Sequence, residues 1–358
     1  TGERATADYW TARTPKAQEV LLTPGQIAAQ NQDIRLRDTS LVNLAAQPER
    51  LSGREVRQHI MAAMQDFWTE ELPLEYVGKA LLTQRQWLEA RQNCQMEALP
   101  EKVEVRYAVT TERTDLRLLP VAEGWYSEPG DVHYDDLQGT VLGPAEAVII
   151  EHTSKDGRFA FVQAEDYRGW VQADKLALAE QEDWLRYAAP AQVAVVTVSR
   201  KYCQAGDRHQ LYQLGAVIPL GKVQGETGNL QPAQQGLLLP TRDDEGRLVI
   251  ENREPVYDDT LHDGYLPCTR ENFIRMAFRC LGDEYGWGGQ DDSVDCSSFA
   301  QDVYHTLGLY IPRDADHQET ALLKQVQLKD MKTAARYSVV GSKAQPGDLL
   351  FKDRKSVV

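Results

Sequence analysis

Residues 286–304, "GWGGQDDSVDCSSFAQDVY", decide how the C-terminal part of the chain folds. Three glycines precede Cys296, and Asp295 is of a residue type that commonly caps the start of a helix. Apolar side chains then recur every four residues, at Phe299, Val303 and Leu307. This spacing is typical of one buried helix face, so the stretch predicts a helix that begins near Cys296, after a glycine-rich loop.

A cysteine in the first turn of a helix is favoured as a thiolate, because unpaired backbone N–H groups and the positive end of the helix dipole lie beside it. The glycines at 286, 288 and 289 leave room for the backbone of a substrate. Cys296 is therefore a candidate nucleophile. Taken by itself, it also fits a small buried core residue, which is the ordinary role of a free cysteine.

The motif around Cys296 resembles that of the NlpC-type cell-wall cysteine peptidases, which are papain-like enzymes. Their motif has a Tyr-x-Trp-Gly-Gly loop, an Asp-Cys-Ser-Gly-Phe helix start, and then Pro-Arg and a Gln. The matching residues here, in order, are Tyr285, Trp287, Gly288, Gly289, Asp295, Cys296, Ser297, Phe299, Pro312, Arg313 and Gln318. Ser298 stands where the family usually has glycine, and "AQPGDLLF" at 344–351 matches the next family signature.

The resemblance implies a γ-D-glutamyl-diamino-acid endopeptidase that acts on peptidoglycan stem peptides. Cys296 would attack the carbonyl of the γ-linked D-glutamate and form a thioester, which water would then hydrolyse. The Cys296 backbone N–H and a nearby side chain would hold the oxyanion. By position in the motif, the residues that would line the pocket are Tyr285, Asp295 and Ser297.

Asp314 follows the Pro-Arg pair directly. In the subgroup of the family with two bacterial SH3-like domains, an acidic residue at this place resembles the one that binds the free amine of an N-terminal L-alanine. A carboxylate is the expected receptor for an ammonium, although a helix cap or a surface charge explains Asp314 equally well. The first barrel usually closes this pocket, and its candidates here are Asp135 and Tyr167, which also fit ordinary surface residues.

The catalytic histidine is where this chain departs from the family. The family's base lies on the strands after "GDLLF", but no histidine follows His317. His305 would lie about 13 Å along the helix from Cys296, out of reach, whereas spacing alone leaves His317 open. We expect the chain to stop before its catalytic histidine and before the last strands of the domain. We therefore also expect an unpaired sheet edge at 349–351 and no peptidase activity in the chain as it stands.

The periodicity along the chain predicts a multidomain α+β protein. Residues 1–100 are mostly helical, with helix starts at Thr23 and Ser52. Short alternating strands follow, with tight turns at 156–157 and at Gly169, as in small β-barrels. Together with the family resemblance, this pattern implies a helical segment at 1–100, SH3-like barrels at 101–185 and 186–264, and a papain-like peptidase domain at 265–358 that lacks its C-terminal strands.

A further helix is expected just before the glycine loop. Thr269 is its candidate N-cap, and Gly282 is expected to end it. Its buried stripe would be formed by Phe273, Ala277, Cys280 and Leu281. On this interpretation Cys280 is a core residue and not a second nucleophile.

Composition excludes several other function classes. The 358 residues include 39 Lys and Arg and 54 Asp and Glu, and a net charge of -15 argues against nucleic acid or an anionic membrane surface as the main partner. No apolar run is long enough to span a membrane. The five cysteines form no CxxC pair and the seven histidines are scattered, so we expect no metal and no cofactor. The expected partners are peptidoglycan-derived peptides, bound by a monomer.

Several alternatives fit the same sequence. The chain begins at Thr1 without a basic or an apolar signal region, so either a signal already removed or a cloning scar explains its start. We expect an extracytoplasmic protein, with cytoplasmic recycling of wall peptides as the alternative. A non-catalytic peptidoglycan-binding protein, or an amidase or acyltransferase on the same core, are the other functions. The diamino acid is either meso-diaminopimelate or lysine, and the role either recycling or wall remodelling.

Overall fold

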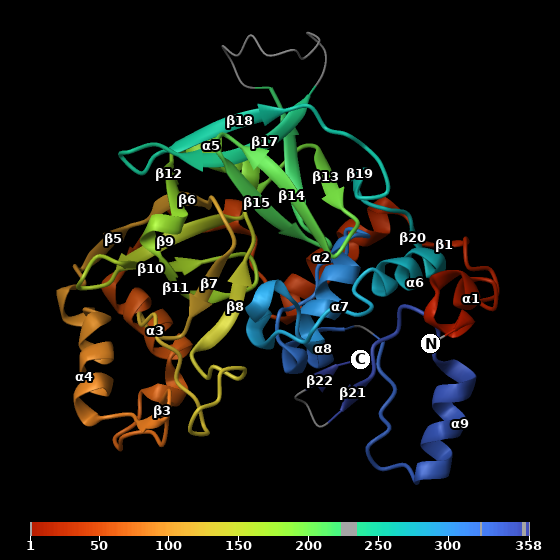
Figure 1. Ribbon diagram of the computed structural model, residues 1–358, viewed down its shortest axis with the longest axis horizontal. Coiled ribbons are helices and arrows are strands. Elements are labelled where there is room, and N and C mark those ends of the chain that lie inside the picture. Colours follow the sequence, from red (N-terminus) through yellow and green to blue (C-terminus); the bar gives the residue numbers. More distant parts are fainter. Residues whose placement is uncertain (1, 223–234, 323, 353–355, 358) are drawn as a thin grey trace.

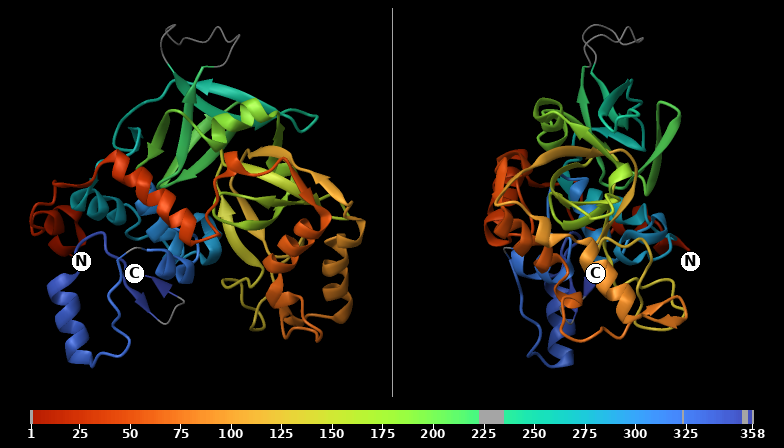
Figure 2. Two further views of the ribbon diagram at one scale, coloured as in Figure 1. Left: turned by 180° about the vertical axis from the view of Figure 1, so that it is seen from behind. Right: turned by 90° about the vertical axis from the view of Figure 1, so that its left-hand side faces the viewer.

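The computed structural model describes residues 2–222, 235–322, 324–352 and 356–357. It arranges them as two β-units that lie against each other and a group of helices beside them (Figure 1). Seen from behind, the helices of the N-terminal segment lie against both the first β-unit and the C-terminal helices (Figure 2). Within these ranges no helix combines the length and the apolar character that a membrane span needs.

The helices of the first hundred residues begin where capping chemistry predicts. Thr23 and Ser52 each form a capping box, and so does Thr83. The α-helices of the described part of this segment are α1 (Ala7–Thr11), α2 (Pro24–Arg37), α3 (Gly53–Ala63) and α4 (Gln84–Asn93). Its strands, with the one that follows, are β1 (Val20–Leu22), β2 (Arg50–Ser52), β3 (Tyr76–Val77), β4 (Ala80–Leu81) and β5 (Lys102–Glu104).

These helices do not share one core. Ile34 of α2 packs with Phe273 and Leu307 of the C-terminal region, and β1 pairs with β20 (Cys268–Thr269). In contrast, Ile60 of α3 and Trp87 of α4 pack against the first β-unit. The N-terminal segment therefore ties the C-terminal region and the first β-unit together.

The first β-unit is one seven-stranded antiparallel sheet with the order β12-β6-β9-β10-β11-β7-β8. Its strands are β6 (Arg106–Thr110), β7 (Thr114–Arg117), β8 (Gln138–Leu142), β9 (Ala147–Thr153), β10 (Phe159–Gln163), β11 (Arg168–Gln172) and β12 (Leu176–Ala179). The predicted turn at 156–157 joins β9 to β10, with Gly157 at a φ of 71°. β8 lies at the sheet edge and runs beside the glycine loop of the C-terminal region.

The predicted turn at Gly169 is wrong. The chain turns between Ala164 and Tyr167, where the Ala164 N–H donates to the Tyr167 carbonyl over 2.9 Å, and Gly169 lies inside β11. A Cβ atom at position 169 would lie 2.3 Å from Leu116 Cδ2 and 2.7 Å from the Arg117 carbonyl oxygen. Glycine is therefore present for the close approach of β7 and not for a bend.

The second β-unit contains a five-stranded sheet with the order β18-β17-β16-β13-β19. Its strands are β13 (Val193–Val196), β16 (Val217–Gly221), β17 (Gly236–Arg242), β18 (Leu248–Arg253) and β19 (Leu261–Asp263), and β14 (Arg200–Ala205) and β15 (Arg208–Gln213) form a separate hairpin. Helix α5 (Gln181–Ala188) links the two β-units, and its Trp184 packs into a core that Ile149 and Leu238 share.

The C-terminal region holds the remaining helices: α6 (Arg270–Phe278), α7 (Cys296–His305), α8 (Ala315–Ala321) and α9 (Thr333–Lys343). The described 3-10 helices of the chain are η1 (Glu3–Ala5), η2 (Leu44–Ala46), η3 (Gln65–Phe67), η4 (Met96–Ala98), η5 (Ala173–Lys175) and η6 (Trp287–Asp292). Thr269 caps α6 as predicted, since its hydroxyl accepts from Asn272 N–H.

Two expectations for this region are wrong. Helix α6 ends at Phe278 and not at Gly282, so its periodicity stops early and Leu281 is exposed. At the C-terminal end, Phe351 does not form an unpaired edge. Strand β21 (Phe351–Lys352) pairs antiparallel with β22 (Ser356–Val357).

Candidate active site

Cys296 is the first residue of α7, as the sequence predicts. Asp295 caps the helix: its Oδ1 accepts the Ser298 N–H over 2.8 Å, and the Ser298 hydroxyl accepts the Asp295 N–H over 2.9 Å. The serine that stands in place of the family's glycine therefore completes a capping box. The thiol is partly buried, next to N–H groups that the helix itself leaves unpaired.

Asp295 and Arg313 form a buried ion pair beneath the start of α7. Arg313 Nη2 lies 2.7 Å from Asp295 Oδ2, and Nη1 lies 3.2 Å from Oδ1, which is the bidentate geometry of strong pairs. Arg313 is only 3% exposed. Burial raises the pKa of Asp295, but Arg313 and the Ser298 N–H outweigh burial and hold it below its usual value. Asp295 is thus ionised at neutral pH and fixes the helix start.

Arg313 also joins α7 to the first β-unit. Its Nη1 donates to the Ser297 hydroxyl over 2.9 Å, and its Nε donates to Thr140 Oγ1 of β8 over 2.7 Å. Gln318 of α8 supports the same corner, since its Nε2 donates to the carbonyls of Ser297 and Pro312. Asp295 and Ser297 were predicted to line the pocket, and the structure places both beside Cys296 with their side chains engaged in this network.

Tyr285 lies beside the thiol. The residue is 52% exposed, and its hydroxyl is close enough to Cys296 for the thiol to affect its pKa. Burial, followed by the neighbouring Cys296 and Asp295, raises the pKa of Tyr285 to about 12. The hydroxyl therefore stays protonated at neutral pH and can donate a hydrogen bond to charge that develops near the sulfur.

The glycine loop that follows Tyr285 is held by groups that sequence reasoning missed. Gln138 Nε2 of β8 donates to the Gly288 carbonyl over 3.2 Å, and Arg113 of the first β-unit donates to the Gly289 carbonyl. The Gly288 N–H in turn donates to Asp295 Oδ2 over 3.1 Å. No sequence signal marks Arg113, Gln138 or Thr140, because each lies more than a hundred residues from its partner, which is the loop for Arg113 and Gln138 and Arg313 for Thr140.

The carboxylate of Asp135 has its acceptors occupied inside the first β-unit. It is 2% exposed, pairs with Arg117 Nη1 at 2.6 Å, and accepts the N–H groups of Trp125 and Leu137. Only its backbone faces the loop, where the Asp135 carbonyl accepts the Trp287 indole N–H over 3.1 Å. Asp135 therefore shapes the loop over the site and leaves no free carboxylate for a ligand.

Asp314 and Tyr167 both lie near enough to Arg313 for its charge to affect their pKa values. Burial raises the pKa of Asp314 to about 6, although Arg313 opposes the shift. Burial and the neighbouring Asp314 likewise raise the pKa of Tyr167. Asp314 precedes α8 but its side chain makes no capping hydrogen bond, so the predicted alternative of a side-chain cap does not account for it. A partly buried carboxyl thus lies beside a phenol from the first β-unit.

None of the seven histidines is hydrogen-bonded to the Cys296 thiol in the part of the chain that the structure describes. His317 Nδ1 lies 2.7 Å from Asp38 Oδ2, and this partner raises the pKa of His317 although burial opposes it. His305 lies on α7 against the ring of Tyr310, and burial lowers its pKa to about 4. Both imidazoles are therefore engaged away from the thiol.

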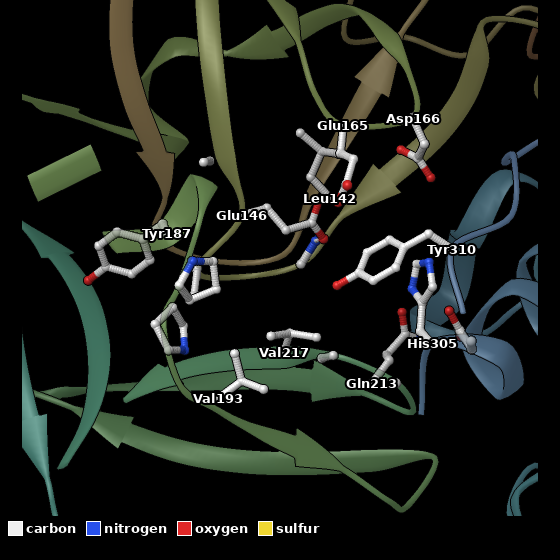
Figure 3. Close-up of a pocket in the computed structure, with 18 of the residues that line it drawn as sticks. Leu142, Glu146, Glu165, Asp166, Tyr187, Val193, Gln213, Val217, His305 and Tyr310 are labelled. Atoms are coloured by element: carbon white, nitrogen blue, oxygen red, sulfur yellow. Dashed lines mark hydrogen bonds between the residues drawn. The ribbon is translucent and has the colours of Figure 1, made fainter. Parts of the chain in front are cut away.

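A cavity of about 1000 Å³ lies behind α7, between the two β-units and the C-terminal region, and Cys296 is not among its lining residues. Figure 3 shows His305 and Tyr310 facing Glu146 and Glu165 across it. Its acidic side chains crowd one another, and burial raises the pKa of Glu146 to about 8. Within the described ranges no group of three His, Cys, Asp or Glu side chains could hold a metal ion.

Two family models match parts of the chain. The model of the NlpC/P60 family matches residues 282–358, and that of the SH3 domain of SH3b1 type matches residues 125–172. The chain therefore contains an NlpC/P60 family domain, which includes Cys296, and an SH3b domain within the first β-unit. No curated protein matches this sequence.

Among solved structures, the fold is similar to that of an NlpC/P60 endopeptidase from Photobacterium damselae subsp. piscicida. The TM-score is 0.64 at 16% identity, and the match covers 84% of this chain and 66% of that one. An NlpC/P60 family protein from Bacillus cereus ATCC 10987 matches with a TM-score of 0.46 at 19% identity, over 70% of this chain and 86% of that one. The multidomain α+β architecture, with an SH3b domain before an NlpC/P60 domain, is thus confirmed.

Proposed function

We propose that this chain is a cell-wall cysteine peptidase that cleaves the γ-D-glutamyl-diamino-acid bond of peptidoglycan stem peptides. The observation that carries the proposal is the setting of Cys296, which opens a helix locked by Asp295 and Arg313 and lies beside the Tyr285 hydroxyl. The NlpC/P60 family domain supports it, because the matched range includes Cys296. The partners would be peptidoglycan-derived peptides, met in the cell envelope by a monomer, with murein peptide recycling as one role.

The reaction would begin with attack of the Cys296 thiolate on the γ-carbonyl carbon of D-glutamate. As the C–S bond forms, the carbonyl π electrons move onto oxygen, where the Cys296 N–H and the Tyr285 hydroxyl would stabilise them. Collapse of this intermediate breaks the C–N bond, and the leaving amine takes up one proton. Water then attacks the thioester and releases the product acid and the free thiol.

The leaving amine must be protonated as the C–N bond breaks, and in this reaction class the acid that does so is an imidazolium. Because the described structure holds no imidazole at the thiol, the chain by itself would be a poor hydrolase. The same observation favours the second candidate function, a peptidoglycan-binding protein with a degenerate peptidase domain. If the chain is a peptidase, added imidazole should restore hydrolysis of the peptide. If it is only a binding protein, added imidazole should have no effect on hydrolysis.

We predict that this chain turns over L-Ala-γ-D-Glu-meso-diaminopimelate slowly in plain buffer and much faster with free imidazole. Imidazole in solution can protonate the departing amine and remove the proton of the attacking water, as a positioned histidine does. Release of diaminopimelate is measured against imidazole concentration, with pyrazole as a control of similar shape but much weaker basicity. Turnover that is equally fast without imidazole would show that a group of the chain already acts as the base.

The substrate amine would be bound by Asp314, with Tyr167 closing the pocket from the first β-unit. A carboxylate that faces an ammonium gives a charge-assisted contact, and both groups gain from the pairing when partly buried. The neighbouring Asp295 and Ser297 would position the backbone of the peptide through the start of α7, since their own side chains are engaged by Arg313.

We predict that Asp314→Asn lowers kcat/KM for the free-amine peptide about 10- to 150-fold, the equivalent of roughly 1.5–3 kcal/mol for a charged hydrogen bond. Only the ionised carboxylate binds the ammonium, and its pKa is about 6. In the unaltered chain, kcat/KM should therefore fall as pH falls below about 6, and Asp314→Asn should remove this step. The matched control is the N-acetyl-L-Ala peptide, and equal rates on free and acetylated peptides would refute the assignment.

A further inference from the structure

Arg113, a residue of the first β-unit, lies where three parts of the chain meet. Directly before β7, its Nε donates to Gln213 Oε1 of the second β-unit over 3.1 Å. Its Nη2 donates to the Gly289 carbonyl and, over 3.3 Å, to the Ser293 carbonyl. Its Nη1 lies 3.2 Å from Asp292 Oδ1. The side chain is only 12% exposed, so the guanidinium is committed to these partners.

The loop that Arg113 holds has an unusual backbone. Gly288 and Gly289 have φ values of 54° and 87°, and the two following acidic residues, Asp291 and Asp292, have φ values of 56° and 51°. This left-handed conformation suits glycine but is uncommon for other residues, although aspartate adopts it more readily than most. Contacts with the rest of the chain therefore help to hold Asp291 and Asp292 in place.

On one side the loop packs closely on β8, since a Cβ at Gly289 would lie 2.9 Å from Val141 Cγ2. On its other side Gly289 and Ser293 line the cavity of about 1000 Å³ together with Arg113 itself, so the loop has open space there. Other side chains also hold the loop. Gln138 donates to the Gly288 carbonyl. Arg200 and Gln213 donate to the Asp292 carbonyl over 2.9 and 3.2 Å. The charged guanidinium of Arg113 contacts three loop residues, which are Gly289, Asp292 and Ser293.

The position of this loop bears directly on the thiol. Tyr285, at its start, lies close to the Cys296 thiol, and the Gly288 N–H donates to the Asp295 carboxylate that caps α7. The Gly286 N–H and the Val294 carbonyl close the base of the loop over 3.0 Å. A loop that moved toward the cavity would take the Tyr285 hydroxyl away from the sulfur and one hydrogen bond away from Asp295.

We propose that Arg113 is a positioning residue for the Cys296 site: its guanidinium holds the glycine loop against the adjoining cavity and so keeps Tyr285 beside the thiol. The inference rests on the proposed function for its effect on hydrolysis. The effect of Arg113 on the reactivity of the Cys296 thiol does not depend on that function. The first β-unit is thereby part of the active-site structure.

The test compares Arg113→Met, which removes every donor, with Arg113→Lys, which keeps the charge and one possible contact. The matched control is Arg208→Met, which makes the same charge change at an exposed pair with Glu112. Each 358-residue chain is treated with iodoacetamide, and the labelling rates of Cys296 and of the buried Cys268 are followed by peptide mapping. Hydrolysis of L-Ala-γ-D-Glu-meso-diaminopimelate is then measured with imidazole present.

Arg113→Met is expected to lower kcat on the order of tenfold with a much smaller change in KM, as expected for the loss of an interaction that acts mainly in the transition state. Cys296 should label faster because Tyr285 no longer lies beside it, whereas Cys268 should label as before. Arg113→Lys should recover part of both effects, and Arg208→Met should match the unaltered chain.

Unchanged kcat together with unchanged Cys296 labelling in Arg113→Met would overturn the proposal. Faster labelling of Cys296 and Cys268 alike would also overturn it, because Arg113 would then support the fold as a whole. If no variant hydrolyses the peptide, even with imidazole, the proposed function fails, and the labelling rates of Cys296 still decide the role of Arg113.

Discussion

Cys296→Ala is expected to abolish the imidazole-dependent hydrolysis of L-Ala-γ-D-Glu-meso-diaminopimelate, with a loss of roughly 10⁴-fold or more. The loss is large because no other group of the site can form the acyl intermediate, and the remaining contacts would only bind the peptide. Turnover is measured as release of the diamino acid, and binding of the peptide is measured by calorimetry. Binding that survives the substitution would separate a lost nucleophile from a lost fold.

Cys280→Ala is the matched control, since Cys280 is the other partly buried cysteine of the same region. Burial, followed by Asp302 and Asp283, raises the pKa of the Cys280 thiol to about 12, so this thiol is inert at neutral pH. Its loss should cost on the order of 1 kcal/mol of stability and leave turnover intact. Full activity in Cys296→Ala would contradict the nucleophile assignment.

Arg313→Met is expected to lower the free energy of unfolding by roughly 3–5 kcal/mol, the usual cost of removing one partner of a buried ion pair. The substitution leaves the Asp295 carboxylate buried without its cation, and it also removes the donors to Ser297 and Thr140. Urea unfolding at neutral pH, followed by circular dichroism, measures the effect.

The double variant Asp295→Asn/Arg313→Met serves as the control, because it removes both charges together and should recover part of the loss. Since the pKa of Asp295 is held below the unfolded value of 3.8, its share of stability is present above that pH and declines as pH falls further. A loss below about 1 kcal/mol in the single variant would contradict the account of this pair, since that is the size of an exposed pair.

Sequence reasoning was most successful where a structural feature depends on a few neighbouring residues. The helix starts at Thr23, Ser52, Thr269 and Asp295 follow from side chains that cap N–H groups three residues on, and all four are present. The position of Cys296 at the start of α7 follows from the same local chemistry.

It was less successful where distant segments meet. Gly169 marks a close approach to Leu116 and not a turn, and only the pairing of β11 with β7 reveals this. Thr140 and Arg313 meet across 173 positions of sequence. Local patterns contain no information on such contacts, so the support of the site by the first β-unit could not be predicted.

The two candidates from the first β-unit illustrate the same limit. Asp135 and Tyr167 are equally plausible pocket residues by type, but their surroundings differ. A buried arginine, Arg117, occupies the carboxylate of Asp135, whereas Tyr167 lies at the turn between β10 and β11, beside Asp314. Which side chain faces a ligand is set by the register of the sheet and by its docking on α7.

The central claim, that Cys296 forms an acyl intermediate with the γ-carboxyl of D-glutamate, is tested most directly with an activated substrate. In L-Ala-D-Glu γ-p-nitrophenyl ester the leaving group needs no proton, so acylation can proceed without a positioned histidine. We predict a burst of about one equivalent of nitrophenolate and a hydroxylamine-labile L-Ala-γ-D-Glu adduct on the peptide that contains Cys296. An adduct on another residue, or an equal burst from Cys296→Ala, would contradict the account.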